Sequence, residues 1–214
     1  MRATSNREAN EIETRHQTQA IRTFFAVDLD APVRRAAAAM AHELQGLPGG
    51  DGVRWVGEEA LHVTLRFLGA TDPDLVPTLV SRVGEQVATV APFRLQLGAP
   101  HLFPSPRRPR MVTLELKPLE PLEALAAVME RGVVAAGFTP EARPFRAHLT
   151  LGRLKNSRSR ALDVTVPDTV PGEAMDVMEA VLFRSELPRS KGSQVRYTPL
   201  ARLPLGAPGG PNHP

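Results

Sequence analysis

The amino-acid sequence predicts an α+β protein built from two similar lobes, each a mostly antiparallel sheet with helices on its outer face. Segments with the alternating apolar pattern of a strand are interleaved with segments of helical periodicity, and this succession occurs twice along the 214 residues. Hydrophobic residues make up 42% of the chain, so the protein can bury a core of its own. We therefore expect a bilobal, pseudo-duplicated fold.

Both ends of the chain differ in composition from the part between them. Residues 1–20 are polar with only scattered apolar side chains, which predicts a disordered extension or a short, loosely held helix. Residues 204–214 (PLGAPGGPNHP) are rich in glycine and proline, which predicts a disordered tail. The two-lobed domain is therefore expected to span residues 21–203.

The first half of this domain alternates predicted strands and helices. Residues 21–29 (IRTFFAVDL) form the first strand. Pro32 favours the first turn of a helix and Asp30 precedes it, so a helix is expected to about residue 47. Residues 61–68 (LHVTLRFL) alternate strictly and predict the second strand. A helix over 72–90 and a strand over 93–97 complete this half.

The second half repeats this order of elements. Residues 111–116 alternate as a strand, and the apolar periodicity of 121–136 predicts a helix. Residues 144–154 (PFRAHLTLGRL) predict a further strand. The segments 175–187 and 195–203 are expected to complete the second half.

A His-x-Thr-Leu tetrapeptide occurs in both halves, at 62–65 and at 148–151. Because side chains alternate along a strand, His62, Thr64 and Arg66 are predicted to share one face of the first strand. The apolar residues between them, and Phe67 after them, are expected to pack on the core.

The second copy follows the same rule. Arg146, His148 and Thr150 are predicted to share a polar face, opposite apolar residues that pack on helices. Arg153 falls on the apolar side unless Gly152 introduces a bulge into the strand. Each motif strand should therefore have an apolar back and a polar front.

Two histidines on such polar faces suit a phosphoryl-transfer site that works without a metal. One neutral imidazole can remove a proton from an attacking water while a protonated one delivers a proton to a departing sugar oxygen, and histidine populates both forms near neutrality. The hydroxyls of Thr64 and Thr150 can donate to phosphate oxygens. Arg66 and Arg146 are candidates for binding the substrate's negative charge.

The two motifs, 86 residues apart (148 − 62), resemble those of the 2H phosphoesterase superfamily. The flanking segments RWVGEEALHVTLRFLG, FPSPRRPR, RPFRAHLTLGRL and LFRSEL are similar to its RNA 2′,3′-cyclic phosphodiesterase branch, first described as 2′-5′ RNA ligases. The resemblance spans about residues 21–203. It implies a bilobal fold with a central catalytic cleft, no metal or other cofactor, and hydrolysis of RNA 2′,3′-cyclic phosphate ends to 2′-phosphomonoesters. It also implies that His62 is the proton donor and His148 the acceptor.

Several other residues could take part. The segment 104–110 (PSPRRPR) carries three arginines and could hold an RNA backbone at the rim of the cleft, or be a solvated surface loop. His101 is expected in a surface loop. Phe103 and Tyr197 are open candidates for stacking a base.

Composition limits the other classes of protein. There is no cysteine, which excludes disulfides, thiolate catalysis and cysteine-ligated metals. The net charge of +3 is small, so no long nucleic-acid-binding stripe is expected. No window approaches the roughly 20 apolar residues of a membrane span, and the start lacks a signal peptide's apolar core. We therefore expect a cytoplasmic protein. Because a bilobal cleft needs no partner subunit, we also expect a monomer.

Three alternative functions compete with hydrolysis of a cyclic phosphate. ATP-driven RNA joining lacks a glycine-rich phosphate loop, so any ligation should be nucleotide-independent and the reverse of a transesterification. A metal hydrolase lacks a His-Glu-x-x-His motif or clustered carboxylates. A non-catalytic protein that binds RNA ends remains the alternative from a different class.

Overall fold

The computed structural model of the protein describes residues 19–155, 170–186 and 195–206. Most of the predicted N-terminal extension, residues 1–18, and residues 207–214 of the predicted tail lie outside the described residues. The strands are β1 (Ile21–Asp28), β2 (Val53–Trp55), β3 (His62–Thr71), β4 (Phe93–Phe103), β5 (Met111–Lys117), β6 (Leu149–Leu154), β7 (Ala174–Val177), β8 (Glu179–Glu186) and β9 (Arg196–Pro204). The α-helices are α2 (Ala31–Gln45), α3 (Val76–Val87) and α4 (Glu120–Ala135).

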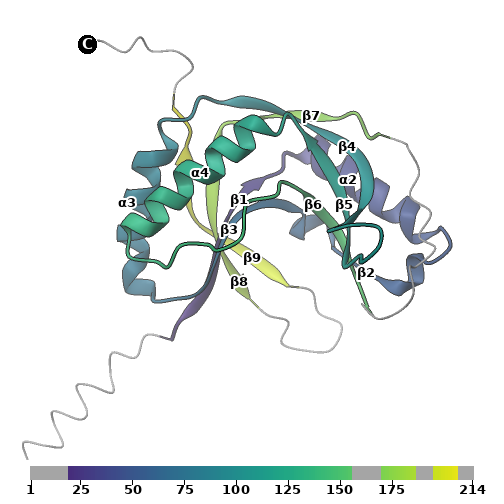
Figure 1. Ribbon diagram of the computed structural model, residues 1–214, viewed down its shortest axis with the longest axis horizontal. Helices are drawn as coiled ribbons and strands as arrows, with labels where there is room; N and C mark the ends of the chain where they lie inside the picture. The colour runs from purple at the N-terminus through teal and green to yellow at the C-terminus, as the bar shows by residue number, and fades with distance from the viewer. Residues whose placement is uncertain (1–18, 156–169, 187–194, 207–214) are drawn as a thin grey trace, which may run out of the picture.

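These strands form two antiparallel sheets, which confirms the predicted α+β class. The four-stranded sheet has the order β3-β1-β8-β9, and the five-stranded sheet has the order β2-β6-β5-β4-β7. Figure 1 shows α3 and α4 on one side of the molecule and α2 on the other. Helices α3 and α4 contact β9 and β3 of the four-stranded sheet, whereas α2 contacts β6 and β2 of the five-stranded sheet.

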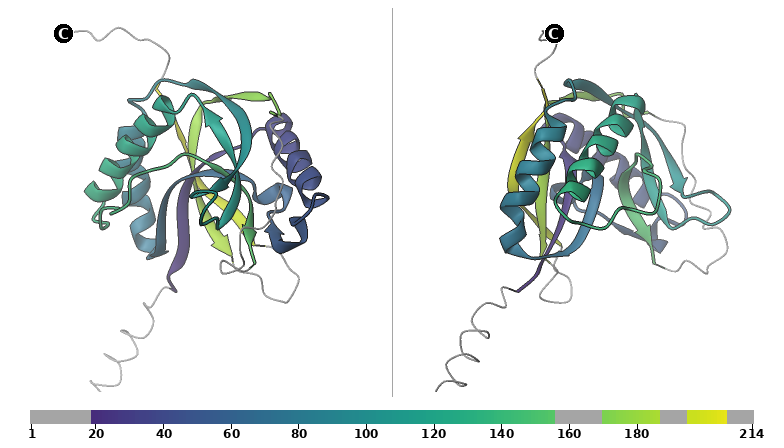
Figure 2. Two further views of the ribbon diagram at one scale, coloured as in Figure 1. Left: turned by 45° about the vertical axis from the view of Figure 1, so that its right-hand side comes forward. Right: turned by 60° about the vertical axis from the view of Figure 1, so that its left-hand side comes forward.

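The lobes are not the two halves of the sequence. Strands β8 and β9 from the end of the chain join β1 and β3 from its beginning, so the first and last parts of the described chain run side by side (Figure 2). Strands β2 and β4, conversely, join the strands of the second half. The interpretation of each sequence half as one lobe was therefore wrong, although the two sheets themselves were predicted.

Helix α2 begins as its sequence predicts. The Asp30 carboxylate accepts a hydrogen bond from the Val33 backbone N–H at 2.9 Å, and Pro32 occupies the first turn, where its missing N–H costs nothing. The other two helices approach each other closely because α4 has glycine at the contact. A Cβ on Gly132 would lie 2.6 Å from the Cα of Val83. None of the described helices is both long and apolar enough to cross a membrane.

Some boundaries differ from those predicted. Strand β4 extends to Phe103, so His101 lies in a strand rather than in a loop. Strand β6 begins at Leu149, and residues 144–148 are not part of it. The segment predicted at 175–187 contains two strands, β7 and β8, because it leaves one sheet at Met178 and enters the other. Strand β9 includes Pro204, and Leu205 is buried, so packed structure continues into the predicted tail.

Candidate active site

The first motif strand contains a bulge that the strict alternation of its sequence does not reveal. In the pairing of β3 with β1, Thr64 lies opposite Ala26 but Arg66 lies opposite Phe25, which leaves Leu65 as an extra residue on β3. One extra residue reverses the faces of the side chains that follow it, here as far as the second bulge at Leu68. Arg66 therefore lies on the helix side of the sheet, and Phe67 lies on the side of His62.

The contacts of Arg66 agree with this reversal. Its Nε is 2.6 Å from the Glu130 carboxylate of α4, its Nη1 is 3.5 Å from Glu141, and its Nη2 donates to the Thr139 carbonyl at 2.7 Å. Arg66 also lines a surface cavity of about 470 Å³ away from the two histidines. The prediction that Arg66 shares the face of His62 was wrong.

Phe67 shows the complementary change. Its side chain is 54% exposed, although the sequence predicted core packing, and its ring centroid lies 5.7 Å from that of Phe24 on the same side of the sheet. Phe24 belongs to a small apolar cluster on this face with Val181 and Phe183. The front of the four-stranded sheet is therefore apolar and aromatic around His62.

His62 is held through its Nδ1 atom. Nδ1 lies 2.8 Å from the Ala60 carbonyl, which can only accept, so the Nδ1 proton points to the backbone and Nε2 is the nitrogen left available for proton exchange. Nε2 lies 3.0 Å from the Thr64 hydroxyl. Burial lowers the pKa of His62 from 6.5 to about 4, against the raising effects of the Ala60 hydrogen bond and of Asp28.

His148 repeats this arrangement. Its Nδ1 lies 2.7 Å from the Arg146 carbonyl, again two residues earlier, which leaves Nε2 for chemistry. The Phe103 ring stacks on the imidazole with 4.5 Å between centroids and 21° between planes. Burial lowers the pKa of His148, and Arg153 lowers it further. Both imidazoles are therefore biased towards the neutral form.

The second motif strand has a bulge at the matching position. In the pairing of β6 with β5, Thr150 lies opposite Thr113 and Gly152 lies opposite Val112, so Leu151 is the extra residue. Arg153 consequently comes to the same face as Thr150. Both side chains approach the sulfur of Met111, Thr150 Oγ1 at 3.9 Å and Arg153 Nη1 at 3.2 Å.

The bulge settles a point that the sequence left open. The sequence predicts Arg153 on the front only if the strand bulges at Gly152, and the extra residue is its neighbour Leu151. Glycine is required next to it because a Cβ on Gly152 would lie 2.4 Å from Val53 Cγ1.

The charge of Arg153 acts on the histidines of both motifs. Strands β3 and β6 contact each other although they belong to different sheets. The charge of Arg153 lowers the pKa of His62 and of His148, so both imidazoles lie within its electrostatic reach. The structure thus brings Arg153 within electrostatic reach of both histidines, with Thr64 in contact with His62 and Thr150 on the face of Arg153.

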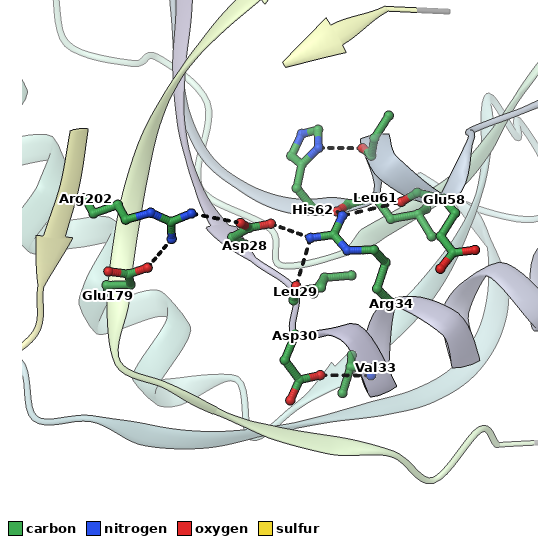
Figure 3. Close-up of polar contacts among 11 residues, drawn as sticks. Asp28, Leu29, Asp30, Val33, Arg34, Glu58, Leu61, His62, Glu179 and Arg202 are labelled. Carbon is green, nitrogen blue, oxygen red and sulfur yellow. Dashed lines mark hydrogen bonds and ion pairs between the residues drawn. The ribbon is translucent and has the colours of Figure 1, made fainter. Parts of the chain in front are cut away.

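Two residues that the sequence analysis did not single out as functional position the first histidine. Asp28 is the cross-strand partner of His62, and Arg34 lies 2.6 Å from its carboxylate. Arg34 also donates to the Leu29 carbonyl at 2.8 Å and to the Leu61 carbonyl at 3.2 Å (Figure 3). Arg34 therefore ties the end of β1 to the residue just before His62. No short sequence pattern marks it.

The remaining candidates lie near one or the other histidine. Arg146 is exposed, and its guanidinium carbon lies 4.3 Å from the centroid of the Phe103 ring. His101 lies on β4, opposite Thr113 on β5, and its Nε2 is 3.1 Å from the Thr113 hydroxyl. Tyr197 lies instead beside His62, with ring centroids 5.0 Å apart. Within the described ranges, no group of three or more His, Asp or Glu residues is arranged to hold a metal ion.

Comparison with known proteins identifies the family. The family model described as LigT-like phosphoesterase matches residues 27–113 and again 114–192, so each match contains one His-x-Thr motif. The chain belongs to the LigT-like phosphoesterase family. This match confirms the predicted resemblance of the two His-x-Thr motifs to the 2H phosphoesterase superfamily.

Individual members of the family support this assignment. A protein of Archaeoglobus fulgidus named RNA 2′,3′-cyclic phosphodiesterase is 33% identical over 144 residues, which are 67% of this chain and 78% of that one. A protein of the same name from Methanothermobacter thermautotrophicus is 32% identical over 170 residues, which are 78% and 91% of the two chains. The crystal structure of E. coli LigT without ligand superimposes with a TM-score of 0.71 at 29% identity, covering 88% of this chain and 99% of LigT.

Proposed function

We propose that the protein hydrolyses 2′,3′-cyclic phosphate ends of RNA to 2′-phosphomonoesters, with His62 as general acid and His148 as general base. The observation that carries this proposal is the matched geometry of the two imidazoles. Each has its Nδ1 proton committed to a carbonyl two residues earlier, and the charge of Arg153 acts on both. The names of the family members cited above supply the substrate class.

The protonation state of His148 in the free protein fits the role of a general base. Burial lowers the pKa of His148, so its Nε2 is unprotonated near neutral pH and can accept a proton from the attacking water. Attack of this water on phosphorus and departure of the ribose 3′ oxygen then produce the 2′-phosphate.

The acid role of His62 depends on the substrate. With a pKa of about 4, His62 is mostly neutral in the free protein near pH 7. A bound cyclic phosphate carries a negative charge, and an opposite charge nearby raises the pKa of an imidazole. Substrate binding therefore favours the protonated form that can deliver a proton to the leaving 3′ oxygen.

Charge on the phosphate oxygens is balanced by donors that do not transfer protons. Arg153, whose charge acts on both imidazoles, supplies a guanidinium, and the hydroxyls of Thr64 and Thr150 supply neutral donors. Arg146 keeps its predicted role as a substrate-binding residue because it is exposed beside His148. Arg66 has no part in this proposal, since its guanidinium is bound to Glu130 and Glu141.

The same groups can act in the opposite direction. If an RNA 5′-hydroxyl replaces water at His148, transesterification joins it to the 2′ phosphate and forms a 2′-5′ linkage without any nucleotide cofactor. We propose this as a reversible side reaction, favoured only where two RNA ends are held together.

The decisive experiment is hydrolysis of 2′,3′-cyclic AMP by the purified full-length protein in EDTA and without added nucleotide. We expect turnover with adenosine 2′-phosphate as the product, identified by phosphorus NMR, and its loss in His62→Ala and His148→Ala. Mainly 3′-phosphate would mean that the two histidines have exchanged roles or that the substrate binds reversed. Binding of cyclic-phosphate RNA without turnover would favour the non-catalytic alternative.

A further inference from the structure

A row of side chains crosses the five-stranded sheet beside His148 and extends beyond the catalytic groups. Phe103 on β4 lies opposite Met111 on β5, Met111 lies opposite Arg153 on β6, and Arg153 lies opposite Arg54 on β2. Cross-strand neighbours share a face, so Arg54 stands on the same face as Arg153, one strand spacing of ~4.8 Å further from the centre of the sheet.

At the Phe103 end of the row the chain makes the loop 104–110. This loop joins β4 to β5 and is tied to the second motif, because the Arg146 guanidinium lies 3.4 Å from the Pro104 carbonyl. Arg107 and Arg108 of the loop are exposed. We call Arg54, Arg107, Arg108 and Arg146 the arginine surface. Arg54 is the cross-strand neighbour of Arg153, Arg146 lies over the Phe103 ring, and the other two lie in the loop that follows Phe103.

The charges of this surface are not balanced within the described chain. Like charges directly opposite each other on a sheet are destabilising, yet Arg54 and Arg153 are such a pair. Of the carboxylates in the described ranges, none lies within 4.0 Å of an arginine of this surface. Arg34, by contrast, is paired with Asp28, and Arg66 is paired with Glu130. Like charges held in adjacent positions of one sheet face suit an external polyanion.

We propose that the arginine surface binds the RNA segment on the nucleophile side of the reacting phosphate. That segment is the strand with a free 5′-hydroxyl in ligation, and the strand downstream of the linkage when a 2′-5′ bond is cleaved. The assignment rests on the proposed function, in which His148 handles the attacking oxygen. Phe103 stacks on His148 and the Arg146 guanidinium lies over the Phe103 ring, so a nucleoside whose 5′ oxygen lies at His148 would be next to this surface.

Hydrolysis of a cyclic mononucleotide does not require this surface. Its nucleophile is water, which carries neither a base nor further phosphates that the arginines could bind. The strand reaction balances without a cofactor. In cleavage, the 3′-hydroxyl attacks phosphorus and the bond from phosphorus to the 5′ oxygen breaks, while His62 accepts the 3′ proton and His148 gives a proton to the 5′ oxygen. Ligation is the same exchange in reverse.

The test compares Arg107→Ala/Arg108→Ala with Arg82→Ala/Arg94→Ala, which removes the same charge from exposed residues that pair with Glu85 and Asp176. Three substrates are assayed: 2′,3′-cyclic AMP, an RNA extended on the 5′ side of a cyclic phosphate, and a 2′-5′-linked RNA with several nucleotides downstream of that linkage. Arg54→Ala serves as a second variant at the other end of the surface.

We expect the Arg107/Arg108 variant to lower kcat/KM for the 2′-5′-linked RNA by about 10- to 100-fold, since two charge-assisted contacts are lost. The slope of log kcat/KM against log salt should become less negative by about 1.4, from roughly 0.7 per phosphate contact on a single strand. The other two substrates and the control variant should stay within about two-fold of wild type.

Three results would overturn the inference. The first is an equal loss on the RNA extended on the 5′ side, which would place the arginines on the leaving-group side. The second is unchanged cleavage of the 2′-5′-linked RNA by the Arg107/Arg108 and Arg54 variants, and the third is the absence of such cleavage in the wild type. In all three cases the wild type still hydrolyses 2′,3′-cyclic AMP, whereas failure of the proposed function would remove that activity too.

Discussion

His62 and His148 have the same backbone contact but different surroundings. Each donates its Nδ1 proton to a carbonyl two residues earlier, so in both rings Nε2 is the nitrogen that the backbone leaves available. His62 lies among Phe24 and Tyr197, whereas His148 stacks on Phe103. Burial lowers the pKa of both, and a pair with one neutral and one protonated imidazole is therefore populated at a lower pH than for two ordinary histidines.

This lowering predicts the pH dependence of the reaction. A group with a lowered pKa holds its proton only at lower pH, so kcat/KM, which reports the free protein, should follow a bell with its maximum below about 6.5. Bound substrate raises the imidazole pKa values, so the maximum of kcat should lie at higher pH. Steady-state kinetics on 2′,3′-cyclic AMP from about pH 4 to 9 measure both profiles. Coincident maxima above about pH 7.5 would contradict the effect of burial.

The two histidines should also act as one unit. His62→Ala and His148→Ala are each expected to lower kcat by about 10² to 10⁴, the contribution of a positioned acid or base. The double variant should lose much less than the product of these factors. Rates with 2′,3′-cyclic AMP and melting curves check both points. A single variant that keeps more than about a tenth of wild-type kcat would exclude its histidine from the chemistry.

Strands β3 and β6 share a feature that decides the composition of the site. Each bulges at the third residue after its histidine, Leu65 in one strand and Leu151 in the other. The bulge brings the fifth residue after the histidine to the front, which is Phe67 in β3 and Arg153 in β6. One strand therefore offers an aromatic ring and the other a guanidinium.

The bulges predict opposite behaviour for two arginines. Arg153→Ala should lower kcat by about 10² to 10³, because a donor to the reacting phosphate is lost, with little change in Tm. Arg66→Ala should keep kcat within about three-fold and destabilise the fold by about 1–3 kcal/mol, because Glu130 loses its partly buried partner. Kinetics and thermal unfolding of both variants provide the check. A large loss of kcat with unchanged Tm in Arg66→Ala would indicate that Arg66 lies on the face of His62, as strict alternation along β3 predicts.

At the scale of the whole molecule, the chain passes repeatedly between the two lobes. The four-stranded sheet combines β1 and β3 with β8 and β9, and α4 from the second half covers it beside α3. Neither half of the sequence contains a complete lobe, so the two lobes should unfold together.

A fragment of residues 1–118 tests this dependence. It lacks α4 and the strand β8 that pairs with β1, so buried residues such as Phe25, Leu79 and Val83 lose part of their cover. We expect an unfolded circular dichroism spectrum for the fragment and one cooperative transition for the full chain. The matched control, residues 1–206, should melt like the full chain. A cooperative melt of the fragment alone would show that the halves fold independently.

The sequence by itself determined the α+β class, the main helices, the paired histidine motifs and the family they resemble. These properties follow from alternation, helical periodicity and short motifs, which depend on neighbouring residues. It also predicted that Thr64 shares the face of His62, which agrees with the 3.0 Å between the Thr64 hydroxyl and His62 Nε2.

Only the tertiary structure decided which arginine joins the histidines and which strands share a sheet. A bulge is a property of two paired strands, and β3 and β6 each show theirs only against a partner, β1 or β5. Sheet membership likewise depends on contacts between segments far apart in sequence, such as β1 with β8. The local sequence pattern does not determine strand register or sheet membership, because the free energy that selects a register comes from burial against the partner strand.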